Sequence, residues 1–153
     1  MPKKFICDAM LGKLCKLLRM CGIDTEYSEK GIALLLESRK ENRTILTANT
    51  RIRGKKNVLF IQTSQPMAQL REVIARYKLQ NELQLFSRCL ECNSKLKPVS
   101  KESVRDKVPY YTYKNFEKFV ICPSCQKVFW KGSHYKNMTQ EIKKILGSIT
   151  ESK

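Results

Sequence analysis

Acidic residues are scarce in this chain of 153 residues. Asp and Glu number 14 against 30 Lys and Arg, which leaves a formal net charge of +16. The surplus is not confined to a tail, because residues 1–80 carry 16 basic and 7 acidic side chains and residues 81–153 carry 14 and 7. A field of one sign over the whole molecule concentrates polyanions near its surface, and nucleic acid is the commonest such partner. The alternative is a basic protein whose charge serves only solubility.

Long apolar runs, internal repeats and a secretory signal are also missing. No run reaches the ~18–20 apolar residues that span a bilayer, so no membrane partner is expected. The N-terminal stretch MPKKFICDAMLGKLCKLLRMCG is basic and partly apolar, but Asp8 and Gly12 interrupt it and no small-residue cleavage site follows. Organelle import sequences share these properties. We therefore expect an intracellular protein, in the first place cytoplasmic, with a nuclear or organellar location as the alternative.

Apolar residues make up 42% of the chain, which is enough for a packed core. Their periodicity predicts strands over 3–8, 23–28, 43–48 and 57–63 and helices over 10–22, 32–42 and 64–79. This order predicts an α/β domain with a small, mostly parallel sheet over residues 1–82. A turn-rich, strand-like module follows over 83–138, including a strand-like stretch at 110–122, and a short C-terminal helix and tail complete the chain over 139–153.

The seven cysteines fall into two groups. Cys7, Cys15 and Cys21 stand singly, whereas the other four form two CxxC pairs separated by 29 residues: Cys89 with Cys92, and Cys122 with Cys125. An odd count without a secretory signal indicates reduced thiols and a metal. Two such pairs predict one tetrahedral four-thiolate zinc, which is structural because no coordination position stays open. Two redox dithiols are the alternative, but neither pair opens a predicted helix after a strand.

Four stretches of the chain resemble the motifs of a known family, in the family's order. They are FICDAMLGKLCKLLRMCGIDTEY, RTILTANTRI, SRCLECNSKL and CPSCQKVFWKGSHYKNM. This pattern, from about residue 4 to residue 138, is similar to the Mut-seven C-terminal family, whose proteins combine a PIN-like ribonuclease fold with a C-terminal zinc ribbon. The resemblance implies RNA as the partner. It also implies metal-dependent endonuclease chemistry, in which clustered acids hold magnesium or manganese.

The acids of that chemistry are only partly present. By resemblance, Asp8 corresponds to the family's first-strand acid and Asp24 to the acid of its GxDT element, while Glu29 is the nearest remnant of an acidic cluster before the second helix. Where the family has LTRD this chain has LTAN, so Ala48 replaces an arginine and Asn49 an aspartate. Asn49 keeps an oxygen but no charge, and hard cations depend on carboxylate charge. The catalytic set is therefore Asp8, Asp24 and a degenerate Asn49; the alternatives are a strand-end hydrogen-bonding acid and a turn residue.

Basic and aromatic side chains supply the candidate RNA contacts. Charges meet phosphates, and rings stack on exposed bases. The candidates at phosphates are Lys13, Lys16, Arg19, Arg51, Arg53, Lys55 and Lys56, and those beside the zinc are Arg88, Trp130, Lys131 and His134. For the charges the alternative is a solvated face, for Trp130 it is core packing, and for the single histidine it is a structural role.

Three functions agree with these patterns. The first is an RNA-binding protein on a PIN-like ribonuclease scaffold whose metal-site acids are partly lost. The second is an active metal-dependent endoribonuclease, a hydrolase, that uses Asp8 and Asp24. The third is a stable component of a ribonucleoprotein particle, held by RNA or by a protein partner. The depleted acids leave the enzymatic question open at the level of sequence.

Overall fold

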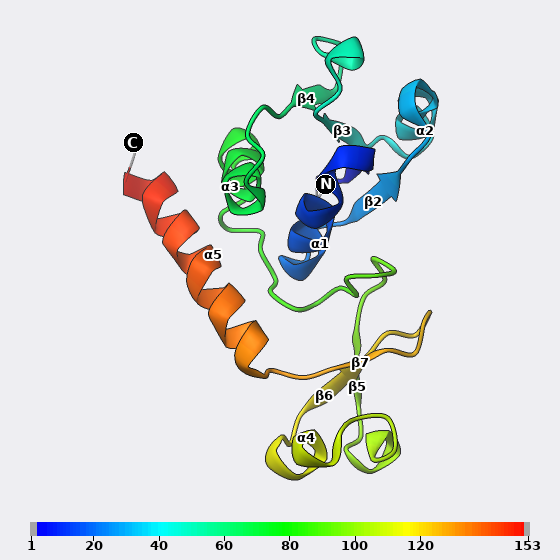
Figure 1. The fold of residues 1–153 in the computed structure, drawn as a ribbon, viewed down its shortest axis with the longest axis vertical. Coiled ribbons are helices and arrows are strands. Elements are labelled where there is room, and N and C mark those ends of the chain that lie inside the picture. The colour runs from blue at the N-terminus through cyan, green and yellow to red at the C-terminus, as the bar shows by residue number, and fades with distance from the viewer. Residues whose placement is uncertain (1–2, 152–153) are drawn as a thin grey trace.

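The N-terminal part of the protein is a parallel α/β domain (Figure 1). The computed structural model describes residues 3–151. Four parallel strands, β1 (Phe5–Asp8), β2 (Thr25–Ser28), β3 (Thr44–Thr47) and β4 (Val58–Phe60), form one sheet in the order β2-β1-β3-β4. The helices between and after them are α1 (Gly12–Met20), α2 (Leu34–Glu41) and α3 (Pro66–Tyr77). The predicted α/β class and parallel sheet are thereby confirmed.

The two central strands are buried along their whole length. β1 and β3 read FICD and TILT, the nearly continuous apolar and β-branched pattern of strands covered on both faces. Phe5 and Cys7 point into the larger core, where α1 and α3 pack, whereas Ile6 points into a smaller core with Leu34 of α2. This alternation follows from the two-residue period of a strand. It fixes which helices cover which face of the sheet.

Helix α2 is less buried than the sequence predicted. Among its apolar residues only Leu34 is fully buried, whereas Leu36 is 64% exposed, and Ile32 in the 3₁₀ turn before the helix is 57% exposed. The helix has eight residues and rests on the smaller core, so it presents only one narrow stripe to the sheet.

The second part of the described chain is a small antiparallel module. Strands β5 (Lys97–Val99), β6 (Phe119–Ile121) and β7 (Val128–Phe129) pair in the order β5-β6-β7. The expectation of strand structure from residue 110 is corrected, because Tyr110–Asn115 forms helix α4. Pro109 begins this turn with φ −61°, and its carbonyl accepts from the backbone N–H of Tyr113 at 3.0 Å. Local proline geometry thus overrides the strand preference of the tyrosines.

The C-terminal helix joins the two parts. Helix α5 (Ser133–Glu151) starts directly after the antiparallel module and runs back to α3 (Figure 1), several residues longer than predicted. Ile142, Ile145 and Ile149 are buried in the same core as α1 and α3. The helix is therefore a strap between the module and the sheet domain. Within the described residues, none of the helices combines the length and hydropathy that crossing a bilayer requires.

Candidate active-site edge and metal centre

The carboxyl ends of β1 and β3 meet at the point where the strand order reverses. In the sheet, β2 lies on one side of β1 and β3 lies on the other side. Ligands of open parallel sheets usually bind at the carboxyl ends of the strands at such a point. There the Thr47 hydroxyl donates to Asp8 Oδ2 at 2.9 Å and accepts from the backbone N–H of Asn49 at 2.9 Å. The structure thus brings Asp8 and Asn49 together through Thr47.

Asp8 is already committed to protein donors. It is 6% exposed, and the backbone N–H of Ala9 donates to its Oδ1 at 2.8 Å while Thr47 occupies its Oδ2. Asn49 Oδ1 accepts from the backbone N–H of Arg51 at 3.0 Å and so caps the 3₁₀ turn that follows. Both carboxylate oxygens of Asp8 and the side-chain oxygen of Asn49 therefore already have a local structural role.

The remaining acids near this edge do not complete a cluster. Glu29 follows β2 directly and is exposed, with Tyr27 Oη 3.3 Å from its Oε1. Glu37 of α2 pairs with Lys30, and this hydrogen bond lowers the pKa of Glu37. Among the described side chains, no group of three or more acids or histidines brings its ligand atoms together. These residues do not fit a carboxylate-held magnesium or manganese ion.

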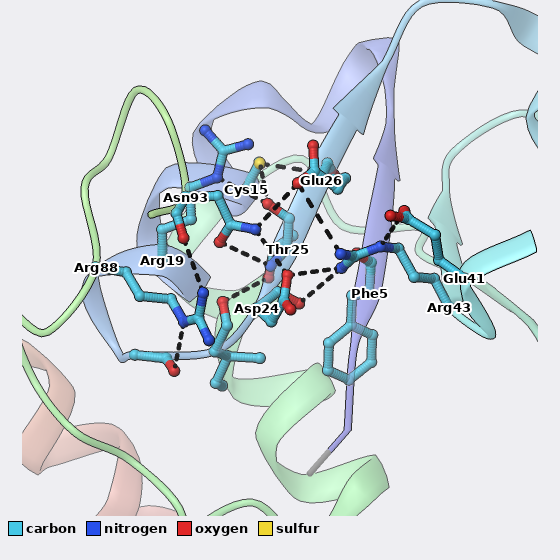
Figure 2. Close-up of polar contacts among 12 residues, drawn as sticks. Phe5, Cys15, Arg19, Asp24, Thr25, Glu26, Glu41, Arg43, Arg88 and Asn93 are labelled. Atoms are coloured by element: carbon cyan, nitrogen blue, oxygen red, sulfur yellow. Dashed lines mark hydrogen bonds and ion pairs between the residues drawn. The ribbon is translucent and has the colours of Figure 1, made fainter. Parts of the chain in front are cut away.

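Asp24 lies at the amino ends of the parallel strands, whereas Asp8 lies at their carboxyl ends. The parallel register pairs Phe5 with Thr25 and Asp8 with Ser28, so Asp24 precedes the first residue of β2. Figure 2 shows its carboxylate between Arg43, at 2.8 Å, and the side-chain amide of Asn93, at 2.7 Å. Burial opposes ionisation, but these two hydrogen bonds outweigh it and lower the pKa of Asp24. The predicted pairing of Asp24 with Asp8 at one site is absent from this geometry.

Two of the predicted RNA-binding arginines hold the module against the sheet domain (Figure 2). Arg19 is 7% exposed and donates to the carbonyls of Thr25 at 2.8 Å and Leu90 at 2.8 Å. Arg88 donates to the carbonyls of Gly22 at 3.2 Å and Asn93 at 2.8 Å. Of the three phosphate candidates on α1, only Lys13 and Lys16 are therefore exposed, because Arg19 is buried.

Gly22 makes this close docking possible. Its φ is +83°, and a Cβ at this position would lie 2.4 Å from the carbonyl oxygen of Gln84 in the incoming linker. A side chain would clash with that backbone and strain its own, so only glycine fits.

The two CxxC segments form matching turns. In the first, the N–H of Asn93 donates to the carbonyl of Cys89 at 2.9 Å; in the second, the N–H of Gln126 donates to the carbonyl of Cys122 at 2.9 Å. Asn93 and Gln126 both have a φ of +66°, so each turn closes through a left-handed residue directly after its second cysteine. Neither pair opens a helix, so the local structure matches the zinc-site prediction.

The four thiols converge on one point. All four sulfur atoms lie within 4.8 Å of one another, and the sulfurs of Cys89 and Cys125 are 3.7 Å apart. A regular tetrahedron with Zn–S bonds of about 2.3 Å requires S···S distances of about 3.8 Å, so the cluster is compatible with zinc. Burial raises the pKa of Cys122, but N–H donors from Cys125 and Ser124 and bonds from other thiols outweigh it and set the value at about 7.

The other three cysteines belong to the interior. Cys7, Cys15 and Cys21 are buried in the larger core. Burial raises the pKa of Cys21 to about 12, which keeps its thiol protonated.

A protein-family model matches most of the chain. Residues 3–142 match the model of the Mut7-C RNAse domain. The chain belongs to the Mut7-C RNAse domain family. This confirms the resemblance that the motifs indicated, over nearly the whole chain. No curated protein and no solved structure was found to match it.

The exposed cations that the sequence predicts at phosphates lie on two segments of this Mut7-C domain. Lys13 and Lys16 lie on α1, and Lys16 pairs with Glu91 of the module at 3.3 Å. The β3–β4 connection carries four exposed cations: Arg51, Arg53, Lys55 and Lys56. Because β3 and β4 are parallel, this connection runs from the carboxyl edge, beside Asn49, to the amino edge. There Lys55 and Lys56 line a cavity of about 310 Å³ together with Arg39, a cation that the sequence analysis passed over.

Trp130, Lys131 and His134 lie together where β7 passes into α5. Trp130 is half-buried and packs against Phe119 with ring centroids 6.3 Å apart. Part of its side chain is therefore covered by packing, and the rest is exposed. Lys131 and His134 are exposed.

Proposed function

We propose that this Mut7-C domain binds RNA, and that the site at the carboxyl ends of β1 and β3 does not cleave the bound RNA. The observation that carries the proposal is the carboxyl edge of the sheet, where Asp8 is the one buried carboxylate and both of its oxygens accept from the protein. A two-metal or one-metal nuclease site needs several carboxylates that face a common point. Here Asn49 stands at the neighbouring strand end, and Lys30 neutralises Glu37.

Charge supports RNA as the ligand. The chain carries a net charge of +16, and the β3–β4 connection exposes four cations within six residues, beginning two residues after Asn49. Phosphate contacts of this kind provide most of the affinity of non-specific nucleic-acid binding. Membership of an RNAse domain family favours RNA among the polyanions. The zinc ion, when bound, supplies structure and no open position for chemistry, since four thiolates complete its shell.

The second candidate is an active metal-dependent endoribonuclease. It is favoured by the family and by the position of Asp8, Glu29 and Asn49 at one edge of the sheet. In that case a metal would have to draw Glu29 inward, because Glu29 is exposed in this structure. Membership of a ribonucleoprotein particle stays a prediction, which co-sedimentation with large particles at moderate salt tests.

An RNA binding and cleavage assay separates the first two candidates. The zinc-loaded full chain is mixed with labelled single-stranded RNA and with a labelled hairpin, with and without manganese. We expect retention of RNA without manganese and intact RNA in both conditions. The comparison uses Asp8→Asn, which keeps the side-chain shape, and the matched change Asp106→Asn at an exposed acid of the module.

The outcomes distinguish the two halves of the proposal. Manganese-dependent cleavage that disappears in Asp8→Asn and persists in Asp106→Asn would replace the first candidate by the second. Failure to retain either RNA at low salt would remove RNA binding altogether.

A further inference from the structure

A cavity of about 410 Å³ opens between the end of the antiparallel module and the start of α5. Four aromatic rings line it, those of Phe86, Phe129, Trp130 and Tyr135, and they come from the linker, from the β7 segment and from the first turn of α5. The residues that matter are Phe86, Leu90, Lys127, Phe129, Trp130 and Tyr135. Its size lies in the range of small-molecule sites, which bury an apolar ring against similar walls.

The aromatic side chains that line this cavity pack against other side chains of the protein. Phe86 and Tyr135 meet edge to face with ring centroids 4.2 Å apart. Trp130 rests on Phe119, which is 3% exposed and therefore anchored in the module. A Cβ at Gly132 would lie 3.2 Å from Trp130 Nε1, so the glycine leaves the indole room against the backbone. A preformed aromatic surface binds a flat ligand without first having to order its own side chains.

One of the rings that line the cavity, the indole of Trp130, also carries a hydrogen-bond donor. Within the part of the chain that the structure describes, the Trp130 indole N–H has no acceptor. A flat ligand with carbonyl or ring-nitrogen acceptors at its edge matches this donor, and nucleobases carry such groups.

The charges around the cavity are positive. Lys127 belongs to the lining, and Lys131 Nζ stands 5.3 Å from the centroid of the Tyr135 ring. No acid is among the lining residues. An apolar peptide would gain nothing from these cations, whereas a nucleotide places its phosphate beside its base.

From these features we propose that the aromatic cavity takes one unpaired nucleobase of single-stranded RNA, stacked on Trp130, with the adjoining phosphate beside Lys127 and Lys131. The inference rests on the proposed RNA binding and names the form of RNA that is bound. A base-paired duplex does not enter, since its bases are stacked and their faces covered.

Intrinsic fluorescence tests the proposal in the unmodified protein. Trp130 is the single tryptophan of the chain, so its emission reports on this cavity alone. We expect a single-stranded oligouridylate to quench the emission. An abasic oligonucleotide with the same number of phosphates should bind without quenching, and a duplex should leave the emission unchanged.

Substitutions provide a second measurement by anisotropy of labelled RNA. Trp130→Leu keeps an apolar contact with Phe119 but removes the stacking surface, and we expect about tenfold weaker binding of single-stranded RNA with an unchanged salt slope. Trp130→Phe should restore most of the affinity. The matched control is Tyr111→Leu, which removes an aromatic ring of the same module that is 72% exposed and outside the cavity; it should bind as the unmodified protein does.

Each result decides between the two claims. Equal binding of oligouridylate and abasic strand without quenching overturns the base pocket and leaves RNA binding intact. No binding of either strand overturns RNA binding itself. Equal weakening by Tyr111→Leu and Trp130→Leu also overturns the pocket, because stacking would then not be localised there. If Trp130→Leu fails to fold, the quenching comparison in the unmodified protein still decides.

Discussion

At the scale of single residues, charged side chains in this protein do two different jobs. Arg43 is 6% exposed in its side chain and pairs with Asp24 at 2.8 Å and Glu41 at 2.8 Å. Asp24 in turn accepts from Asn93, which lies in the first CxxC turn. Buried charges of this kind fix the position of the segments that they join. Removing one partner of such a pair is destabilising, because the other partner is left as an unpaired buried charge. Charges such as Lys55 stay in water and are free to meet a phosphate.

The role of Asp24 predicts a pH-dependent loss of stability. Asp24→Asn should lower the free energy of unfolding by about 1–2 kcal/mol at neutral pH, because the ion pair with Arg43 becomes a hydrogen bond from a cation to a neutral amide. The folded pKa of Asp24 lies below its ordinary 3.8, so its contribution is present above that value and is lost as the pH falls through the folded pKa. The difference between the two proteins should therefore shrink below about pH 4.

Urea unfolding at several pH values measures this difference. Asp106→Asn, at an exposed acid, serves as the control and should change stability by less than about 0.5 kcal/mol. An equal cost for both substitutions, or a difference that does not depend on pH, would contradict the positioning role of Asp24.

At the scale of elements, the antiparallel module depends on connections rather than on a core of its own. Its strands have two or three residues, and few of its apolar side chains, such as Val104 and Phe119, are fully buried. The cysteine cluster closes it from one side, and α5 ties it to the sheet domain through Ile142 and Ile145. Zinc binding in such modules is coupled to folding.

The cluster predicts one structural zinc per chain. Cys92→Ser should lose the metal, lower the melting temperature and shift Trp130 emission to the red, because Trp130 packs on Phe119 inside the module. Metal analysis and fluorescence measure both effects. Cys21→Ala, at a thiol in the larger core, is the control; it should keep the zinc and the emission maximum although it costs some stability. A fully folded Cys92→Ser protein without metal would contradict the structural role.

At the scale of the whole molecule, exposed positive charge lies at both the carboxyl and the amino ends of the parallel strands. The β3–β4 connection links them, from Arg51 beside the carboxyl edge to Lys56 at the amino edge. An extended strand of RNA could therefore contact cations along this connection. Binding of this kind is driven by release of counterions and so weakens with salt.

The salt dependence is the measurable consequence of this charge. For ~6–10 phosphate contacts, affinity for RNA should fall by a factor of about 10³–10⁵ between 50 and 200 mM salt. Lys55→Gln with Lys56→Gln should reduce the logarithmic slope by about 1–2, because up to two contacts are lost. Anisotropy at several salt concentrations measures the slope.

The matched control removes the same net charge from another surface. Lys143 and Lys144 are exposed on α5, so Lys143→Gln with Lys144→Gln should leave the slope nearly unchanged. If both double variants reduce the slope equally, the β3–β4 connection is not a preferred RNA contact.

Local patterns in the sequence were sufficient for much of this protein. The buried strands around Phe5 and Ile45 follow from short apolar stretches, and the two cysteine turns follow from CxxC spacing, because both depend on residues close together in the chain. The family also follows from such stretches. Helix α4 was missed because Pro109 outweighs the strand preference of the tyrosines after it.

The tertiary structure alone decided which charged residues are free. Arg19 reaches the carbonyl of Leu90, 71 positions along the chain, and Asp24 reaches Asn93, 69 positions along. No local pattern encodes such contacts, because they arise only when the module docks on the sheet domain. The same docking places Phe86 beside Tyr135 and so creates the aromatic cavity. The sequence by itself determined the sheet, the CxxC turns and the family. Packing between distant segments decided which charged and aromatic side chains have structural contacts and which stay accessible to a ligand.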